Sequence, residues 1–378
     1  MSLKVAIALT VGLGLATAGV GCTHESARYT RKQAQKSLGK LETPGIEIGE
    51  FKMGRVVDGD TIHVDGLDSS LRLLGVDTEE TFKHENERRA FDAGWEVYKK
   101  GVRGTAPRPV KFATPLGMTA KEWADHWFAG VEKVRLQRDN AAEIRDRYNR
   151  YLAYVLANKN GTWLNYNVEA VRAGMGPYFP KYGQSRLYHK EFLAAEAEAK
   201  AAHRGIWAPG AQAYDDYPER EAWWTARGEF VAAFRAEAEG PNGKPNYIDL
   251  THWDALSQLE ALVGKEVVIL ATVGEVQIGE KGPTRVTLSR AQRSDFPLIF
   301  FDKDVFGTSG IAGWKGEWIT VSGTPSVYEN KHTHKKQLQI VIDHASQITL
   351  SPVPGLTKTT VPPAPVQTPV SPSADNPD

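Results

Sequence analysis

Three short runs of strand-forming residues follow one another closely between residues 51 and 76, and this spacing constrains the fold more than any other feature of the sequence. The runs cover residues 51–57, 61–64 and 71–76, and Asp58-Gly59-Asp60 joins the first two. Asp-Gly between apolar runs is a strong signal for a tight antiparallel hairpin. We therefore expect this part of the chain to begin with a hairpin and a third strand.

Helices and further strands follow these three strands. Residue spacing predicts helices at 119–129, 164–173 and 187–203, and strands at 131–138 and 151–156. Strands first and helices later are typical of an α+β unit built on a small barrel. Residues 82–117, which carry charges and then Gly and Pro, are predicted to form an inserted surface loop or subdomain.

The second half of the chain has a different pattern. A polar, acidic helix is expected at 218–239, and five strands are expected at 266–276, 284–288, 297–301, 317–321 and 337–342. Five strands with a Gly-rich segment between the third and fourth suggest an OB-type barrel, with a plain sandwich or hairpin stack as the alternative. The tail after Ser351 is rich in Pro, Ser and Thr and is expected to be disordered.

Length and composition exclude several classes of protein. A chain of 378 residues is long enough for two or three domains. The 46 Lys and Arg residues balance 46 Asp and Glu residues, which excludes a broad polycation that coats nucleic acid. The single cysteine excludes an internal disulfide and a zinc site built on paired cysteines.

The N-terminus has the pattern of an export signal. One Lys precedes an apolar, Gly- and Ala-rich stretch at residues 5–21, and Cys22 follows it directly. This arrangement resembles a bacterial lipoprotein signal, in which the cysteine is acylated, although Gly19 stands where a Leu is usual. The alternative is ordinary cleavage after Ala18, which leaves Cys22 as a free thiol. The first interpretation places the protein on the bacterial cell envelope through an N-terminal lipid anchor, and the second has it secreted.

Acidic residues stand at the ends of neighbouring predicted strands. Asp58 and Asp60 flank the hairpin glycine, and Asp77 ends the third strand. A hard divalent cation requires several oxygen ligands at close range, and two such loops supply them. Each loop alone also has an ordinary explanation, because Asp-Gly is common turn chemistry.

Two arginines favour a phosphate substrate. Arg72 interrupts an apolar strand shortly before Asp77, and Arg150 ends an Arg-rich segment before a later strand. A metal ion and planar guanidinium groups neutralise a phosphodiester whose charge grows in the transition state, and a further carboxylate polarises the attacking water. An arginine on a half-exposed strand face is the simpler alternative.

Three ordered blocks, at residues 57–61, 71–81 and 146–155, resemble the staphylococcal nuclease (thermonuclease) family. With a weaker block at 174–207, the resemblance covers about residues 51–208. It implies an OB-type barrel with packed helices and a Ca²⁺-dependent phosphodiesterase that acts on DNA and RNA.

The resemblance also implies roles for individual residues. Asp60 and Asp77 would bind Ca²⁺ through their carboxylates and Thr78 through its backbone carbonyl, with Asp58 behind them. Glu80 would hold the attacking water as general base, and Arg72 and Arg150 would grip the phosphate. Three further positions would contact the nucleotide: Arg147, Tyr148 and Tyr182.

The sequence departs from the family pattern at three places. Glu79 stands where a Pro is usual, and its charge would either tighten metal binding or repel the substrate. Asn149 replaces a Gly, which is tolerable because Asn accepts left-handed backbone conformations. Residues 82–117 make the separation between Glu80 and Arg150 longer than in compact members.

The expected fold class is therefore a staphylococcal-nuclease-like OB barrel with packed helices (α+β), followed by an all-β second domain, a five-stranded OB-type barrel. The predicted segments are 1–22 lipoprotein-type signal, 23–50 linker, 51–210 nuclease-like domain, 211–247 helical linker, 248–350 OB-type β domain and 351–378 disordered tail. The predicted function is a secreted, lipid-anchored Ca²⁺-dependent nuclease with DNA and RNA as substrates and no obligate protein partner. The alternative is a non-catalytic nucleic-acid or protein-binding module.

Overall fold

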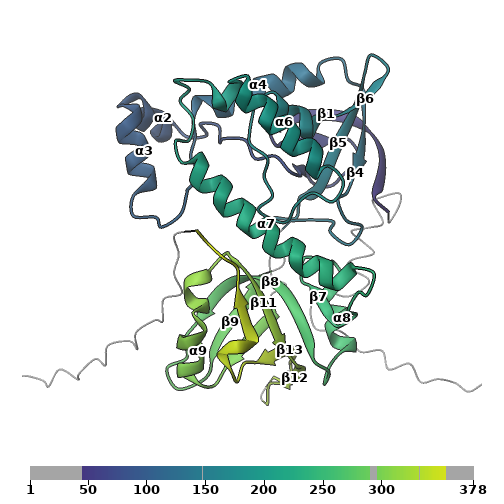
Figure 1. Cartoon of the computed structure of the whole chain (residues 1–378), viewed down its shortest axis with the longest axis vertical. Coiled ribbons are helices and arrows are strands. Elements are labelled where there is room, and N and C mark those ends of the chain that lie inside the picture. The colour runs from purple at the N-terminus through teal and green to yellow at the C-terminus, as the bar shows by residue number, and fades with distance from the viewer. Residues whose placement is uncertain (1–44, 147, 290–295, 332, 355–378) are drawn as a thin grey trace, which may run out of the picture.

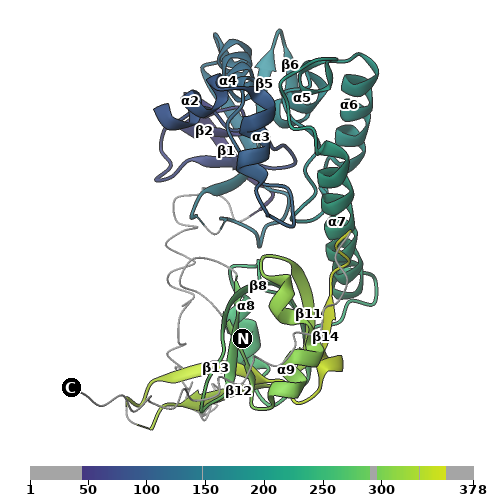
Figure 2. The same cartoon turned by 90° about the vertical axis from the view of Figure 1, so that its left-hand side faces the viewer.

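The computed structural model describes residues 45–146, 148–289, 296–331 and 333–354. The predicted signal, most of the first linker and nearly all of the C-terminal tail lie outside these residues. The described part consists of two folded units, and the long helix α7 (Tyr217–Glu239) runs from the first unit to the second (Figures 1 and 2). Within the described residues, no helix is both long and apolar enough to cross a membrane.

The first unit is built on a closed barrel. Its strands are β1 (Glu47–Asp58), β2 (Thr61–Val64), β3 (Leu71–Leu73), β4 (Lys133–Gln137), β5 (Tyr151–Lys159) and β6 (Thr162–Asn165). They follow the order β3-β2-β1-β4-β5-β6, and a parallel pairing of β3 with β5 closes the first five into a barrel. This confirms the predicted α+β barrel, including the tight turn in which Asp58 pairs with Thr61.

Helices pack around this barrel. They are α2 (Glu85–Asp92), α3 (Trp95–Arg103), α4 (Pro115–Phe128), α5 (Tyr166–Arg172), α6 (His189–Ala201) and the short η1 (Gly205–Trp207). The three helices predicted from spacing are present as α4, α5 and α6, and α4 begins earlier than expected because Pro115 fits its first turn. The inserted residues 82–117 form α2, α3 and the start of α4 rather than a loop.

Helix α7 contacts hydrophobic clusters of both units. Trp223 and Trp224 lie in one cluster with the apolar residues of the C-terminal sheet. Three arginines of the same helix are buried at intervals of seven or eight residues, at Arg220, Arg227 and Arg235. Because this interval is two helical turns, the three guanidinium groups lie along one stripe of the helix. A buried arginine requires a partner, so this stripe marks a charged contact surface.

The second unit is a curled sheet with short helices. Its elements are β7 (Tyr247–Asp249), α8 (Ala255–Ala261), β8 (Val267–Gln277), β9 (Thr284–Ser289), β10 (Phe296–Phe300), α9 (Lys303–Ser309), η2 (Ile311–Trp314), β11 (Trp318–Gly323), β12 (Pro325–Glu329), β13 (Lys336–Val341), η3 (Ala345–Gln347) and β14 (Ile348–Leu350). The path is β12-β13-β10-β9-β8-β11-β14, with β7 paired to β8.

The prediction of five strands in this unit is wrong in number, because the sheet has eight. The five predicted strands are present as β8, β9, β10, β11 and β13. The additional strands are short, and β12 is separated from β11 by Thr324 alone, so its pattern merges with that of β11. β11 pairs with β8, whereas β12 pairs with β13, which lies parallel to β10. Because the consecutive strands β11 and β12 pair in different parts of the sheet, the sheet curls. The OB-type assignment of this unit stays a prediction.

Candidate active site

The turn between β1 and β2 meets the segment that follows β3. Thr78 donates its backbone N–H to Asp60 Oδ2 at 3.3 Å. The turn approaches this closely because residue 59 is glycine: a Cβ there would lie 2.6 Å from Thr78 Cγ2 and 2.9 Å from the Cβ of Ala120 in α4. The two acidic segments that the sequence indicates therefore lie side by side.

Arg72 of β3 joins these two segments. Its guanidinium forms ion pairs with Asp60 and with Asp77, where Nη2 lies 2.5 Å from Oδ1. Burial alone would raise the pKa of Asp60, but Arg72 and Lys111 outweigh burial and hold this pKa well below its usual value. The same carboxylates raise the pKa of Arg72 although burial opposes the shift. The charges of Asp60 and Arg72 are therefore maintained at neutral pH.

Glu80 lies at the edge of this cluster. Its carboxylate accepts a hydrogen bond from Lys83 Nζ at 2.9 Å, and Lys111 Nζ lies 3.5 Å from its other oxygen. Burial raises the pKa of Glu80, but Lys111 and Lys83 outweigh burial and lower it below its usual range. The carboxylate is 34% exposed and ionised, so it combines access to water with a negative charge.

Asp58 lies behind Asp60 in the turn. Its Oδ1 accepts the backbone N–H of Asp60 at 3.2 Å. Burial, and then the neighbouring charge of Asp60, raise the pKa of Asp58 to about 6. This position agrees with the expected supporting role behind the carboxylates that face the site.

Arg150 lies directly before the strand next to Arg72. It precedes Tyr151, the first residue of β5, which pairs with Leu71 in the parallel contact of β5 with β3. Leu152, two residues further on, is the partner of Arg72. Its guanidinium is held by Asp146 of its own loop, with Nε 2.8 Å from Oδ2. The structure thus brings Arg150 to the neighbouring strand, where its described contacts are with its own loop rather than with the carboxylates.

The predicted nucleotide contacts lie around these arginines. Tyr148 is 67% exposed, and its ring centroid lies 5.5 Å from the guanidinium carbon of Arg150. Tyr182 is 55% exposed and packs edge-on against Phe179, whose ring lies 5.7 Å from the guanidinium carbon of Arg72. Asn149 has a φ of 69°, the left-handed conformation expected where the family has Gly.

The third predicted nucleotide contact, Arg147, lies outside the described residues. The segment on either side of it is described, and Asp146 orders that segment by accepting the backbone N–H groups of Tyr148 at 2.8 Å and Arg150 at 2.9 Å.

Glu79 turns its carboxylate towards the insertion and the start of α7. It is 2% exposed and accepts hydrogen bonds from the backbone N–H of Tyr214 and the hydroxyl of Tyr217, each at 2.8 Å, and from the hydroxyl of Thr114. Burial raises the pKa of Glu79. This carboxylate is therefore a structural anchor that fixes the end of the insertion and the start of α7.

Three lysines near the carboxylates were not indicated by the sequence pattern. Lys83 and Lys111 contact Glu80, and Lys181 approaches from the segment that carries Tyr182. Two of them lie in the insertion, for which the family pattern offers no corresponding position. Charge alone gave no signal, because lysines are common on solvated surfaces.

The oxygen atoms of Asp60 and Asp77 and the carbonyl of Thr78 have the chemistry of a divalent-cation site. Two carboxylates and a peptide oxygen are hard ligands of the kind that Ca²⁺ prefers. The structure gathers positive charge at this place from Arg72 and Lys111. Arg72 and Lys111 thus pair with the carboxylates that are expected to bind Ca²⁺, and the metal assignment stays a prediction.

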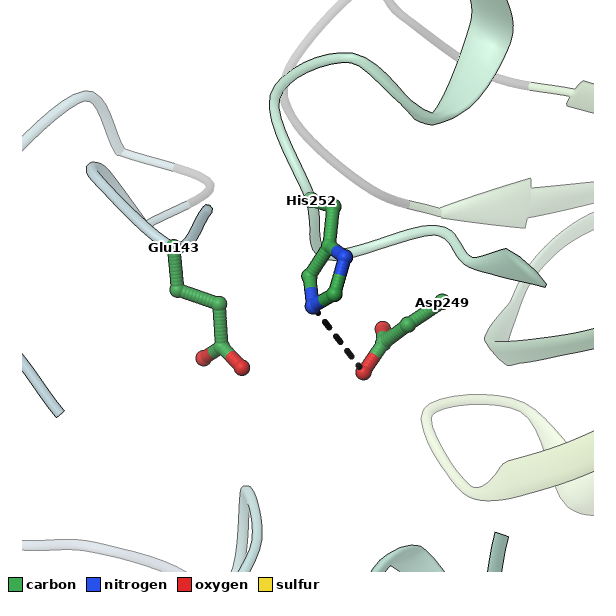
Figure 3. Close-up of side chains that lie close together, drawn as sticks. All are labelled: Glu143, Asp249 and His252. Atoms are coloured by element: carbon green, nitrogen blue, oxygen red, sulfur yellow. Dashed lines mark ion pairs between the residues drawn. The ribbon is translucent and has the colours of Figure 1, made fainter. Parts of the chain in front are cut away.

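A second group of potential ligands lies elsewhere among the described residues. Oxygen or nitrogen atoms of Glu143, Asp249 and His252 lie within 4.8 Å of one another, where the β4–β5 connection meets the segment around β7 (Figure 3). Arg235 of α7 already forms ion pairs with Glu143 and Asp249. Although burial raises the pKa of Asp249, Arg235 outweighs it and lowers that pKa. This group shares no residue with the predicted metal site and is an ionic contact between the two units.

The closed barrel and the cluster of carboxylates and arginines define a nuclease-like protein. A family model described as staphylococcal nuclease homologue matches residues 70–209. Three relatives match 41–44% of this chain. An uncharacterized protein of Methanocaldococcus jannaschii is 35% identical over 164 residues, which cover 70% of its length.

The other two relatives are named thermonuclease. The protein of Staphylococcus hyicus is 30% identical over 162 residues, or 75% of its length, and that of Staphylococcus intermedius is 30% identical over 175 residues, or 82% of its length. The chain belongs to the family of staphylococcal nuclease homologues. The C-terminal sheet lies beyond the residues that the family model matches.

Proposed function

We propose that this protein is a Ca²⁺-dependent nuclease that hydrolyses phosphodiester bonds of DNA and RNA. The observation that carries the proposal is the position of Arg72, which contacts Asp60 and Asp77 at the same time and so joins the expected phosphate clamp to the expected metal ligands. Two relatives with the name thermonuclease support the same reaction.

The residues of the cluster can each take one role in the hydrolysis of a phosphodiester bond. Ca²⁺ held by Asp60, Asp77 and the Thr78 carbonyl would supply positive charge beside the phosphate. Glu80 is ionised and accessible, so its carboxylate can accept a proton from the attacking water. Arg72 would present its planar fork to the phosphate oxygens, whose charge grows as the transition state forms, by exchanging Asp60 and Asp77 for the substrate.

Arg150 would act on the leaving-group side. It directly precedes the strand that pairs with that of Arg72, and binding a phosphate would require its guanidinium to exchange Asp146 for the substrate. The exposed rings of Tyr148 and Tyr182 would pack against sugar or base, because aromatic side chains accept every base by stacking. Arg147 completes the proposed contacts with nucleotide phosphate.

We also propose that the protein is exported and lipid-anchored at Cys22 to a bacterial cell envelope, with secretion as the alternative. The support is the apolar stretch of residues 5–21 that ends directly at the single cysteine of the chain. An anchored nuclease would act on nucleic acid outside the cell and would require no protein partner to do so.

The experiment that tests the nuclease proposal is incubation of the full chain with single-stranded DNA or RNA in Ca²⁺, in Mg²⁺ or in chelator. We expect cleavage in Ca²⁺, little in Mg²⁺ and none in chelator, because an irregular ligand set suits Ca²⁺ and Mg²⁺ demands near-octahedral geometry. Full activity in Mg²⁺ without Ca²⁺ would contradict the choice of metal. Binding without cleavage in every condition would favour a non-catalytic module.

A further inference from the structure

The insertion places a lysine on the carboxylates of the proposed metal site. Lys111 Nζ lies 2.7 Å from Asp77 Oδ1 and 3.5 Å from Glu80 Oε1. Lys111 is 34 residues from Asp77 along the chain, and its side chain is 38% exposed. It is therefore a cation that reaches the acidic cluster from a separate segment.

The backbone around Lys111 is fixed from the acidic side. Thr114 donates its N–H to the carbonyl of Glu80 at 3.0 Å, and Ala113 forms a parallel bridge with Glu80. The hydroxyl of Thr114 also donates to the buried carboxylate of Glu79. The end of the insertion thus runs beside the acidic segment as a short strand-like contact.

The same backbone is fixed from the opposite side by two tyrosines. The hydroxyl of Tyr214 accepts the N–H of Phe112 at 3.0 Å and donates to its carbonyl at 2.7 Å. The hydroxyl of Tyr98 donates to the carbonyl of Ala113 at 3.0 Å. Because the main chain is held on both sides, the position of the Lys111 side chain at Asp77 is a built feature of the fold.

Lys111 differs from the other lysine at this edge. Lys83 contacts Glu80 from a side chain that is 58% exposed, and among the described residues its ion pair is with Glu80. Lys111 also contacts Asp77, whose carboxylate is 4% exposed and is a proposed metal ligand. A cation that approached Asp77 would meet the ammonium of Lys111 at 2.7 Å from the oxygen that it must bind.

We propose that Lys111 is an internal counter-ion of the metal site, which neutralises Asp77 and Glu80 in the metal-free protein and opposes the binding of Ca²⁺. The proposal rests on the proposed function in so far as this site binds Ca²⁺. Its consequence is that the insertion raises the Ca²⁺ concentration that the protein requires. Extracellular modules bind Ca²⁺ with dissociation constants of roughly 10⁻⁴–10⁻³ M. An opposing positive charge at the site would shift the Kd towards this weak range.

The test compares Lys111→Met with the unaltered full chain by calorimetric titration with CaCl₂ alone and by thermal unfolding in chelator. Two unit charges a few ångströms apart interact strongly even at an effective dielectric constant of about 20, so Lys111→Met should lower the Kd for Ca²⁺ by about tenfold or more. In chelator the variant should melt at a lower temperature, because Asp77 and Glu80 lose a counter-charge. Saturating Ca²⁺ should remove or reverse that difference.

Two matched variants complete the design. Lys121→Met changes net charge equally, but Lys121 pairs with Asp125 on α4, and its Kd should stay within about twofold of the unaltered chain. Lys111→Arg keeps the charge and should retain the original Kd. If Lys111→Met does not fold in chelator, Lys111→Gln, which keeps a polar group, takes its place in both measurements.

An unchanged or higher Kd in Lys111→Met would overturn the proposal, as would unchanged melting in chelator. Absence of Ca²⁺ binding in the unaltered chain and in all variants would contradict the calcium part of the proposed function instead. The melting temperature in chelator would then decide the counter-ion role. A lower melting temperature in Lys111→Met, but not in Lys111→Arg or Lys121→Met, would support it.

Discussion

Arg227 of α7 and Glu317, the residue before β11, form an ion pair with only 1% of each side chain exposed. Glu317 also accepts hydrogen bonds from Trp223 Nε1 at 3.1 Å and from Arg108 Nη1 at 2.7 Å. One carboxylate therefore connects three segments: the insertion, the long helix and the C-terminal sheet. The two units meet through buried polar contacts, which tolerate sliding less than an apolar surface does.

The first prediction concerns this carboxylate. Glu317→Gln keeps the shape of the side chain but leaves Arg227 without a counter-charge, so we expect a loss of about 3–5 kcal/mol in the free energy of unfolding. Urea denaturation measures it. The control is Glu275→Gln, because Glu275 pairs with Lys315 on the surface, where an ion pair contributes at most about 1 kcal/mol. Equal losses in the two variants would show that the buried pair is dispensable.

The second prediction separates chemistry from folding. Glu80→Gln cannot accept the proton of water, and Arg72→Lys and Arg150→Lys lose the bidentate fork. Each should reduce turnover at saturating Ca²⁺ by at least about a hundredfold, while the protein still unfolds cooperatively. Steady-state cleavage of single-stranded DNA measures the effect. Arg135→Lys, on the exposed part of β4, is the control and should retain normal turnover.

Arg150 is the assignment that this series tests most sharply, because its guanidinium is paired with Asp146. Near-normal turnover in Arg150→Lys, with Arg72→Lys inactive, would show that another arginine holds the phosphate. Arg145 pairs with Asp68 at 2.7 Å and stacks on Tyr151, with 9% of its side chain exposed. Arg147 would then be the remaining candidate.

The third prediction is a pH dependence of stability that arises from Lys181. Burial, and then the charge of Arg227, lower the pKa of Lys181 to about 8. Its ammonium lies 4.4 Å from the ring centroid of Trp223. The charged groups that act on it are Arg227 and Lys111, which repel it, and Asp77 and Glu317, which attract it.

In the unfolded chain Lys181 keeps this proton up to a pH near 10.5. Between about pH 8 and 10.5 the unfolded state therefore binds more protons than the folded state. Because of this difference, the contribution of Lys181 to the free energy of unfolding rises with pH. Lys181→Met should therefore be more stable than the unaltered chain at pH 7, by up to about 3 kcal/mol, and the difference should shrink towards pH 10. Melting temperature against pH measures it, with exposed Lys190→Met as control. A constant difference across this range would contradict the prediction.

The fourth prediction concerns the anchor. Cys22→Ala removes the only thiol of the chain, so mature protein in a bacterial host should move from the membrane fraction to the soluble exported fraction. Immunoblots of the two fractions measure this. An unchanged distribution would favour cleavage after Ala18 or another means of attachment.

The sequence predicted those parts of the fold and the candidate site that depend on short-range patterns. The hairpin at Asp58-Gly59-Asp60 and the interruption of an apolar strand by Arg72 are local signals, and both elements occur as expected. Strands β7 and β14 are three residues long, which is too short to show the alternation of apolar and polar residues that indicates a strand. The membership of Lys111 in the site also left no signal, because a contact across 34 residues depends on the packing of a whole segment.

The parallel contact of β3 with β5 has a consequence for how the protein folds. Leu71 and Tyr151 are paired although about 80 residues separate them, and the entropic cost of closing a loop must be met before such a contact stabilises anything. Helices α2, α3 and α4 form within that loop from local interactions. The pairing that closes the barrel is therefore expected late on the folding pathway. Because it also brings the strand that follows Arg150 beside Arg72, a nascent or half-folded chain would have no complete active site.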